Sequence, residues 1–96
     1  MQVNQVDWIE AFQNYVRLLA GPATYLLHEP MNTIEGVLDS NRFLRIHRSY
    51  IINVRRIAQL CSIVHGQYAV ELKSGQRLQS GRTYNERIRG ALTNPF

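Results

Sequence analysis

The sequence predicts one mainly β domain of the α+β class, in which small antiparallel β-sheets are joined by two or three short helices. Three observations favour this class. A length of 96 residues suits one domain over residues 1–96 and leaves no room for a second. Aromatic and β-branched residues gather in short runs that are separated by polar or glycine-containing turns. In residues 67–72, apolar side chains alternate with polar ones, which is typical of a half-buried strand.

The first third of the chain predicts three strands, at residues 6–12, 15–20 and 23–28. Gln13 and Asn14 supply a polar turn between the first two strands. Gly21-Pro22 interrupts the chain before the third strand, because this dipeptide is a strong turn signal.

A short helix is expected after the third strand. Pro30 and Asn32 open it, and Asn32 is placed to cap it, with Glu35 reaching back from three residues later. Its apolar face would be formed by Ile34, Val37 and Leu38. Residues 39–41 end the helix, and Glu35 and Asp39 occupy its polar side. We therefore expect this helix to lie away from any polyanion.

The second half of the chain predicts an antiparallel meander of three strands, at residues 57–64, 67–72 and 76–80. His65-Gly66 and Ser74-Gly75 provide its two turns.

A closing helix is predicted after the meander. Thr83 and Glu86 have the spacing of a capping box at its start. The expected apolar face of this helix consists of Tyr84, Ile88 and Leu92.

The charges are distributed unevenly along the chain. Residues 1–39 carry one basic and five acidic side chains, a net charge of −4, whereas residues 40–96 carry ten basic and two acidic side chains, a net charge of +8. Ten of the eleven basic residues are arginine, whose planar fork suits bidentate contact with phosphate or a guanine edge. Such asymmetry favours a polyanionic partner. On charge alone, a solvated basic face without a partner is equally consistent.

Several classes of protein lack support in the sequence. No apolar stretch is long enough to span a bilayer, and the N-terminus does not resemble a secretory signal, so a cytoplasmic location is expected. Cys61 is the only cysteine, which excludes an internal disulfide and a thiolate cluster for zinc. The three histidines are scattered, the glycines form no phosphate-binding loop, and Ser49 near His47 does not by itself define a catalytic pair. We therefore expect no enzyme, cofactor, metal or small-molecule substrate.

The run at residues 43–56 (FLRIHRSYIINVRR) combines anchoring residues with basic ones. Its apolar side chains can be buried, whereas arginines at positions 42, 45, 48, 55 and 56 are threaded between them. Arginine can neutralise phosphate and read base edges, and hydroxyl and amide groups can position the DNA backbone. Buried anchors favour this use because fixing a mobile arginine costs roughly 1–2 kcal/mol of side-chain entropy. The run therefore predicts a nucleic-acid contact.

The same run resembles the LytTR DNA-binding domain, the output module of many bacterial response regulators. The family motif F-x-R-x-H-R-S-Y-I-V-N is matched here by Phe43, Arg45, His47, Arg48, Ser49, Tyr50, Ile51, Ile52 and Asn53. A preceding IEA-x-x-NY signature is matched by Ile9, Glu10, Ala11, Asn14 and Tyr15. A following L-x-x-G-x-x-L stretch is matched by Leu72, Gly75 and Leu78. The resemblance extends from residue 8 to about residue 92.

The resemblance implies an elongated fold that presents three loops to successive major grooves of double-stranded DNA. These loops are Gln13–Arg17, His47–Ser49 and Gly81–Asn85. We expect Arg48 and Arg82 to contact bases and Arg45, Ser49 and Arg55 to contact the DNA backbone. The DNA-binding residues expected in all are Gln13, Asn14, Tyr15, Arg17, Arg45, His47, Arg48, Ser49, Arg55, Arg82, Thr83 and Asn85. Binding to paired repeats as a dimer, and a monomeric isolated domain, are also implied.

The sequence departs from the family pattern in two places. Gly81-Arg82 stands where the family usually has Ser-Arg, which leaves the serine contact without a counterpart. Only Met1–Gln5 precede the IEA signature, so the usual first strand is expected to be short or missing. Because no receiver domain fits in this length, we expect the chain to be an output domain excised from a longer regulator.

Alternative readings remain open at this point. His47 and Asn53 are more often structural than base-reading residues in such settings, with Asn53 satisfying a turn backbone. The basic half could instead recognise an acidic partner as a non-enzymatic protein-interaction module. RNA binding is disfavoured, because RNA-binding sheets usually display exposed aromatic pairs.

Overall fold

The computed structural model describes residues 3–63 and 66–92, and within them it confirms the mainly β class. The first sheet has the strand order β3-β2-β1-β5-β4. Its strands are β1 (Trp8–Phe12), β2 (Tyr15–Ala20), β3 (Ala23–Leu27), β4 (Phe43–His47) and β5 (Tyr50–Asn53). The second sheet has the order β6-β7-β8, formed by β6 (Ile57–Ser62), β7 (Tyr68–Leu72) and β8 (Arg77–Gln79). All the strand pairs of both sheets are antiparallel.

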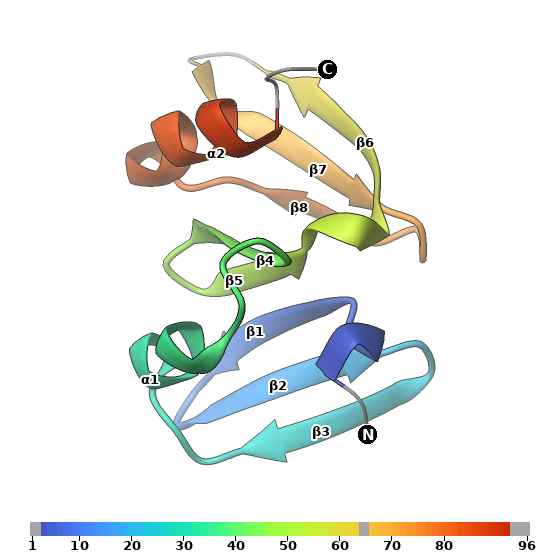
Figure 1. The fold of residues 1–96 in the computed structure, drawn as a ribbon, viewed down its shortest axis with the longest axis vertical. Coiled ribbons are helices and arrows are strands. Elements are labelled where there is room, and N and C mark those ends of the chain that lie inside the picture. The colour runs from blue at the N-terminus through green and yellow to red at the C-terminus, as the bar shows by residue number, and fades with distance from the viewer. Residues whose placement is uncertain (1–2, 64–65, 93–96) are drawn as a thin grey trace.

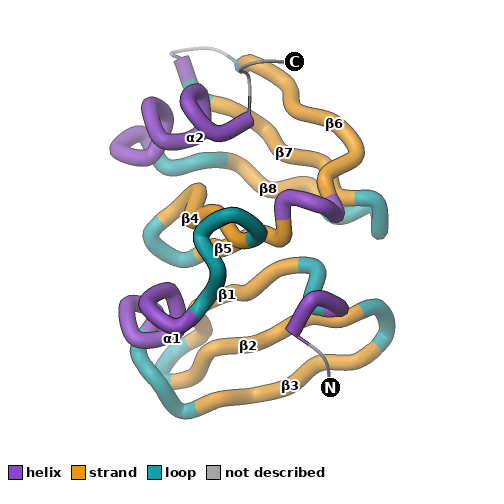
Figure 2. Tube along the Cα trace, in the orientation of Figure 1, coloured by secondary structure: helices purple, strands orange, loops and turns teal. Residues whose placement is uncertain are grey.

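Helices cover parts of both sheets (Figure 1). The α-helices are α1 (Met31–Val37) and α2 (Asn85–Leu92), and short 3-10 turns are η1 (Val3–Gln5), η2 (Val54–Arg56) and η4 (Arg82–Tyr84). The second sheet and α2 lie at one end of the long axis, and β1–β3 lie at the other (Figure 2). The molecule measures 33 × 23 × 21 Å, which agrees with the elongated shape that the family resemblance implied.

Two separate hydrophobic cores lie on opposite faces of the five-stranded sheet. Neighbouring residues of a strand point to opposite faces, so Ile51 enters the first core and Ile52 the second. The first core, under α1, consists of Val6, Ile9, Val16, Leu18, Met31, Ile34, Phe43 and Ile51. The second core, shared with the three-stranded sheet and α2, consists of Trp8, Leu44, Ile46, Ile52, Val70, Leu72, Leu78 and Ile88. The strands β1, β4 and β5 are therefore buried on both faces.

The start of α1 differs from the prediction. The N-cap is Pro30, which makes no side-chain capping bond, so Asn32 does not cap the helix. Proline at a helix N-terminus fixes a backbone angle that suits the first turn. This earlier start changes which face is apolar: Met31 and Ile34 are buried, whereas Val37 is 78% exposed. Leu38 packs against the first core as predicted.

The predicted capping box at the last helix is wrong as well. The chain enters α2 through η4, whose N-cap Gly81 has no side chain to offer, and Thr83 lies inside this turn. A 3-10 turn commonly precedes an α-helix in this way. Instead, Ser80 Oγ donates a hydrogen bond to Asn85 Oδ1 over 2.9 Å.

The predicted strands and turns are found close to their expected positions. β1 begins at Trp8. Residues 3–5 form η1, at the place where the usual first strand was expected to be short or missing. β6 ends at Ser62, and residues 64–65 of the predicted strand and turn lie outside the described residues. Asn53 has the structural role favoured by the sequence, since its Nδ2 donates to Val6 O over 2.8 Å and its Oδ1 accepts from Arg55 N over 3.0 Å.

Replacing Ile52 with alanine should strongly destabilise the domain. Ile52 is fully buried in the second core, and the cavity left by such a truncation costs about 2–5 kcal/mol of unfolding free energy. Val37→Ala is the matched control, because its side chain is mostly exposed and its loss should cost less than about 0.5 kcal/mol. Urea denaturation of both variants measures the difference. Equal losses would contradict the two-core arrangement.

Candidate nucleic-acid interface

The three loops identified from the sequence meet at one edge of the molecule. Ala11 N, next to the β1–β2 turn, donates a hydrogen bond to Ser49 O in the β4–β5 turn over 2.9 Å. Gly81 N, at the start of the β8–α2 connection, donates to Ile46 O in β4 over 2.8 Å. Figures 1 and 2 show the three connections along the same edge, spread over the long axis of the molecule. Segments far apart in sequence therefore form one continuous surface.

The side chain of Arg45 holds the β4–β5 turn through hydrogen bonds. This side chain is only 9% exposed, and its Nη2 donates to the carbonyl oxygen of Arg48 over 2.6 Å. Its Nη1 donates to Asn32 Oδ1 over 2.6 Å and to Glu35 Oε1 over 3.0 Å. A weaker bond of 3.4 Å joins its Nε to His47 O. The guanidinium is thus satisfied by protein groups, which weighs against its predicted contact with the DNA backbone.

The ring of His47 also stabilises the β4–β5 turn. Its Nδ1 accepts a hydrogen bond from Ser49 N over 3.0 Å, so the neutral ring carries its proton on Nε2. A β-bulge between Arg45 and His47 brings this ring opposite Tyr50, with the ring centroids 4.8 Å apart. Burial lowers the pKa of His47, and the charges of Arg48 and Arg45 lower it further. Both effects favour the neutral form of His47 in the folded turn.

Arg48 is the exposed side chain at the tip of this turn. Its carbonyl oxygen and the backbone of Ser49 are both occupied by hydrogen bonds, which fix the main chain of the turn. Among the described residues, its guanidinium has no hydrogen-bond or ion-pair partner. The geometry therefore presents a free cation on a rigid backbone.

The β1–β2 turn has an unusual backbone at its tip. Gln13 has a φ of 54°, a left-handed conformation that is uncommon for any residue other than glycine. Gln13, Asn14 and Tyr15 are exposed, and Tyr15 stacks on His28 with the ring centroids 5.0 Å apart. Arg17 differs from these residues, because it forms an ion pair with Glu10 and its guanidinium lies 4.1 Å from the ring centroid of Phe12.

The β8–α2 connection packs closely on the β4–β5 turn. A side-chain carbon placed on Gly81 would lie 3.2 Å from Cδ2 of His47, so glycine permits the contact between the two loops. Arg82 and Thr83 are exposed, and the guanidinium of Arg82 has no partner within the described part of the chain. Asn85, by contrast, is buried by its contact with Ser80. In this loop, Arg82 and Thr83 therefore present their side chains to a ligand.

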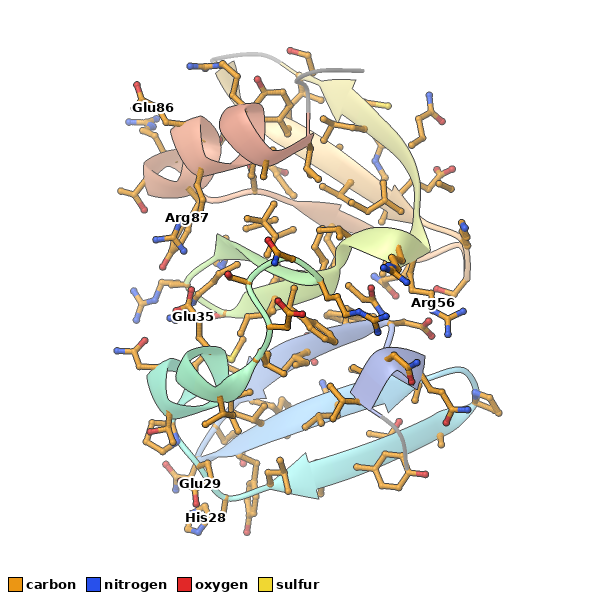
Figure 3. The ribbon with its side chains drawn as sticks, viewed as in Figure 1. His28, Glu29, Glu35, Arg56, Glu86 and Arg87 are labelled. Atoms are coloured by element: carbon orange, nitrogen blue, oxygen red, sulfur yellow. The ribbon has the colours of Figure 1, made fainter. Side chains whose placement is uncertain are left out.

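One carboxylate links the helices on this edge (Figure 3). Glu35 Oε1 lies 3.0 Å from Arg45 Nη1, and its Oε2 lies 3.1 Å from Arg87 Nη1 in α2. The expectation that α1 lies away from the interface is not supported by these contacts, because Glu35 reaches the arginine under the central turn. Sequence reasoning missed this cluster. A usable signal was Arg45 itself, since an arginine between two buried apolar residues needs an internal partner.

Arg55 and Arg56 lie in η2, away from the three loops. Figure 3 shows Arg56 on the opposite side of the molecule from Glu35 and Arg87. Arg56 is 3.5 Å from Asp7 Oδ1, and the side chain of Arg55 is exposed. The predicted backbone contact of Arg55 would require the same duplex to reach both edges, so its position does not favour that role.

The residues that the structure describes contain neither a candidate metal site nor a membrane-spanning helix. Within residues 3–63 and 66–92, no three His, Cys, Asp or Glu side chains are grouped so that they could hold a metal ion. In the same ranges, no helix combines the length and apolar character that crossing a bilayer requires.

Comparison with known proteins agrees with this geometry. The sequence profile of a family described as the LytTr DNA-binding domain matches residues 1–93. A solved structure described as the LytTr DNA-binding domain of a methyl-accepting/DNA response regulator from Bacillus cereus superposes with a TM-score of 0.90. The match covers 96% of this chain and 84% of that chain at 24% sequence identity. It confirms the fold.

Two regulators are similar in sequence to most of the chain. The transcriptional regulatory protein LytR of Staphylococcus aureus (strain N315) is 35% identical over 68 residues, which is 71% of this chain. The sensory transduction protein LytT of Bacillus anthracis is 29% identical over 69 residues, or 72% of this chain. In both cases the chain spans 28% of the relative's length.

The lowered pKa of His47 predicts a loss of stability in mild acid. As the pH falls below about 6.5, the unfolded chain takes up a proton on this residue before the folded chain does, so the free energy of unfolding decreases. In His47→Gln this contribution should be absent, so the variant should lose less stability between the two pH values. Urea denaturation of both proteins at about pH 7.5 and about pH 5 measures the difference. An equal pH dependence in the two proteins would show that His47 is not held neutral.

Proposed function

The chain belongs to the LytTR family of DNA-binding domains, and from this membership we propose that it binds double-stranded DNA sequence-specifically for a bacterial transcription regulator. The single observation that carries the proposal is the convergence of three loops on one edge, two of which bear exposed arginines without a protein partner. Arg48 and Arg82 are these arginines. A free guanidinium on a fixed backbone can make the bidentate contact by which arginine recognises guanine.

The shape of the molecule supports contact with successive major grooves. The loops are spread along the long axis, which measures 33 Å. One helical turn of DNA measures about 34–36 Å, so neighbouring major grooves on one face of the duplex have a similar spacing. An edge of this length can therefore face adjacent grooves of one duplex, and the three loops lie along it without a recognition helix.

The proposed roles follow from exposure and from the partners that each side chain already has. We assign base contacts to Arg48 and Arg82, and contacts with phosphate or sugar to the polar groups around them. These groups belong to the exposed Gln13, Asn14, Tyr15 and Thr83, together with the half-buried Ser49. His47 is assigned to the structure of the turn.

The remaining features of the proposal concern the whole regulator. We propose that two copies bind paired repeats as a dimer on DNA, that the isolated domain is a monomer, and that the protein acts in the cytoplasm without a catalytic activity. The similarity to LytR and LytT supports a role in regulation, with this domain as the part that binds DNA.

Replacing Arg48 with alanine should weaken binding to the selected site by about 1–3 kcal/mol and relax discrimination at one base pair. The reason is that one bidentate base contact is lost while the backbone of the turn is retained. Arg82→Ala should have the same effect at a different base pair. Lys73→Gln, which removes one exposed charge away from the three loops, is the matched control. Fluorescence anisotropy with single-base variants of the site makes the comparison.

Selection of duplexes from a random pool tests the proposed function itself. The wild-type domain should prefer its selected site over random duplex by roughly 10³-fold or more. Its affinity should fall with salt, with a log–log slope of about −0.9 per phosphate neutralised. Equal affinity for all duplexes would contradict sequence-specific binding. Absence of duplex binding, together with binding to acidic polypeptides, would favour a protein-interaction module instead.

A further inference from the structure

We propose that Arg45 is a positioning residue for base readout: together with Asn32 and Glu35 of α1, it holds the β4–β5 turn so that Arg48 reaches its base. This inference rests on the proposed function and assigns a role to α1 within it. It replaces a direct contact of Arg45 with the DNA backbone, and it makes sequence discrimination depend on a cluster that does not touch the base.

The first step of the argument is the burial of Arg45. Its side chain is 9% exposed, whereas Arg48, three residues later in the β4–β5 turn, is exposed. A phosphate contact would require the guanidinium to leave three polar partners on two elements. Buried charges are retained in proteins when they are paired and hydrogen-bonded, and this one is both.

The second step is the atom that Arg45 binds in the turn. Its Nη2 donates to the carbonyl oxygen of Arg48 itself, over 2.6 Å. This bond acts on the peptide of the residue proposed to read a base, so it restrains the direction in which the Arg48 side chain leaves the turn. His47 and Ser49 restrain the neighbouring peptide through the 3.0 Å bond between Ser49 N and Nδ1.

The third step is the anchor on α1. Asn32 and Glu35 lie three residues apart, on neighbouring positions of one helix face, and both accept from Nη1 of Arg45. Glu35 also binds Arg87 of α2, the helix that follows the third loop. The Glu35 carboxylate therefore connects the second loop, through Arg45, to α2, the helix that follows the third loop. A negative charge near a DNA-binding edge opposes DNA affinity, so its position is better explained by orientation than by attraction.

A charge-conserving substitution separates positioning from contact. Arg45→Lys keeps one positive charge but replaces two nitrogens, Nη1 bonded to α1 and Nη2 bonded to Arg48 O, with a single one, because an ammonium lacks the planar fork. We expect the preference for the selected site over random duplex to fall about tenfold or more, a loss comparable to that from removing a base contact. The salt slope on random duplex should stay unchanged. Arg55→Lys is the matched control, because Arg55 is exposed and lies in η2 next to Arg56, which Figure 3 shows on the opposite side from Glu35.

Glu35→Ala provides a second variant that leaves Arg45 in place. If Glu35 positions the turn, random-duplex binding should be retained or strengthened while the preference for the selected site falls. If Arg45 were instead a phosphate contact restrained by Glu35, both affinities would rise together and the preference would be unchanged. Thermal melting of each variant in the absence of DNA verifies that it is folded.

A double-mutant cycle identifies the residue through which Arg45 acts. In an Arg48→Ala background, Arg45→Lys should reduce the preference no further, since the side chain that it positions is gone. A general loss of structure would lower the preference in both backgrounds alike and would overturn the inference. So would a wild-type preference retained in both Arg45→Lys and Glu35→Ala. If the wild-type domain itself failed to discriminate between duplexes, the proposed function would fail instead.

Discussion

Burial of both faces of β1, β4 and β5 is the constraint on which the rest of the structure depends. Ile51 and Ile52 are consecutive and both almost completely inaccessible, so each face of the sheet must be covered. α1 and the N-terminal turn cover one face, and the three-stranded sheet with α2 covers the other. Because the faces of β1, β4 and β5 are occupied, these three strands can meet a ligand only at their ends. The connections there carry the exposed polar and basic side chains, as is usual for loops placed by a rigid scaffold.

The arginines divide according to their partners rather than their place in the sequence. Arg17, Arg45, Arg56 and Arg87 form ion pairs with carboxylates, and they tie together elements of the fold. Arg48 and Arg82 are exposed and have no such pairing among the described residues. An ion pair at the surface contributes little to stability, but a nearly buried and multiply bonded guanidinium such as that of Arg45 fixes geometry. The paired arginines thus stabilise the fold, whereas Arg48 and Arg82 supply exposed positive charges at the edge where the loops lie.

Local patterns predicted the strands well and the helix starts poorly. Alternation and β-branched residues identified β7 and β2, because a strand's side-chain pattern is visible in the sequence. Pro30 and Gly81 shifted the helix starts, since neither uses the side-chain cap that the pattern suggested. The three loops were identified through the family motif, but the partners of Arg45 lie 10 and 13 residues away on α1. Contacts of that kind depend on the packing of one element against another, which no local pattern encodes.

The contact between Gly81 and His47 has a consequence for the DNA. The hydrogen bond from Gly81 to Ile46 and the absence of a side chain at Gly81 hold the second and third loops as one rigid body. If Arg48 and Arg82 contact bases as proposed, the backbone positions from which their side chains extend cannot adjust to each site. Any mismatch in groove spacing must then be absorbed by the duplex, at an elastic cost set by its base steps. Flexible pyrimidine–purine steps between the contacted bases would lower that cost, so base pairs that no side chain touches would still influence affinity.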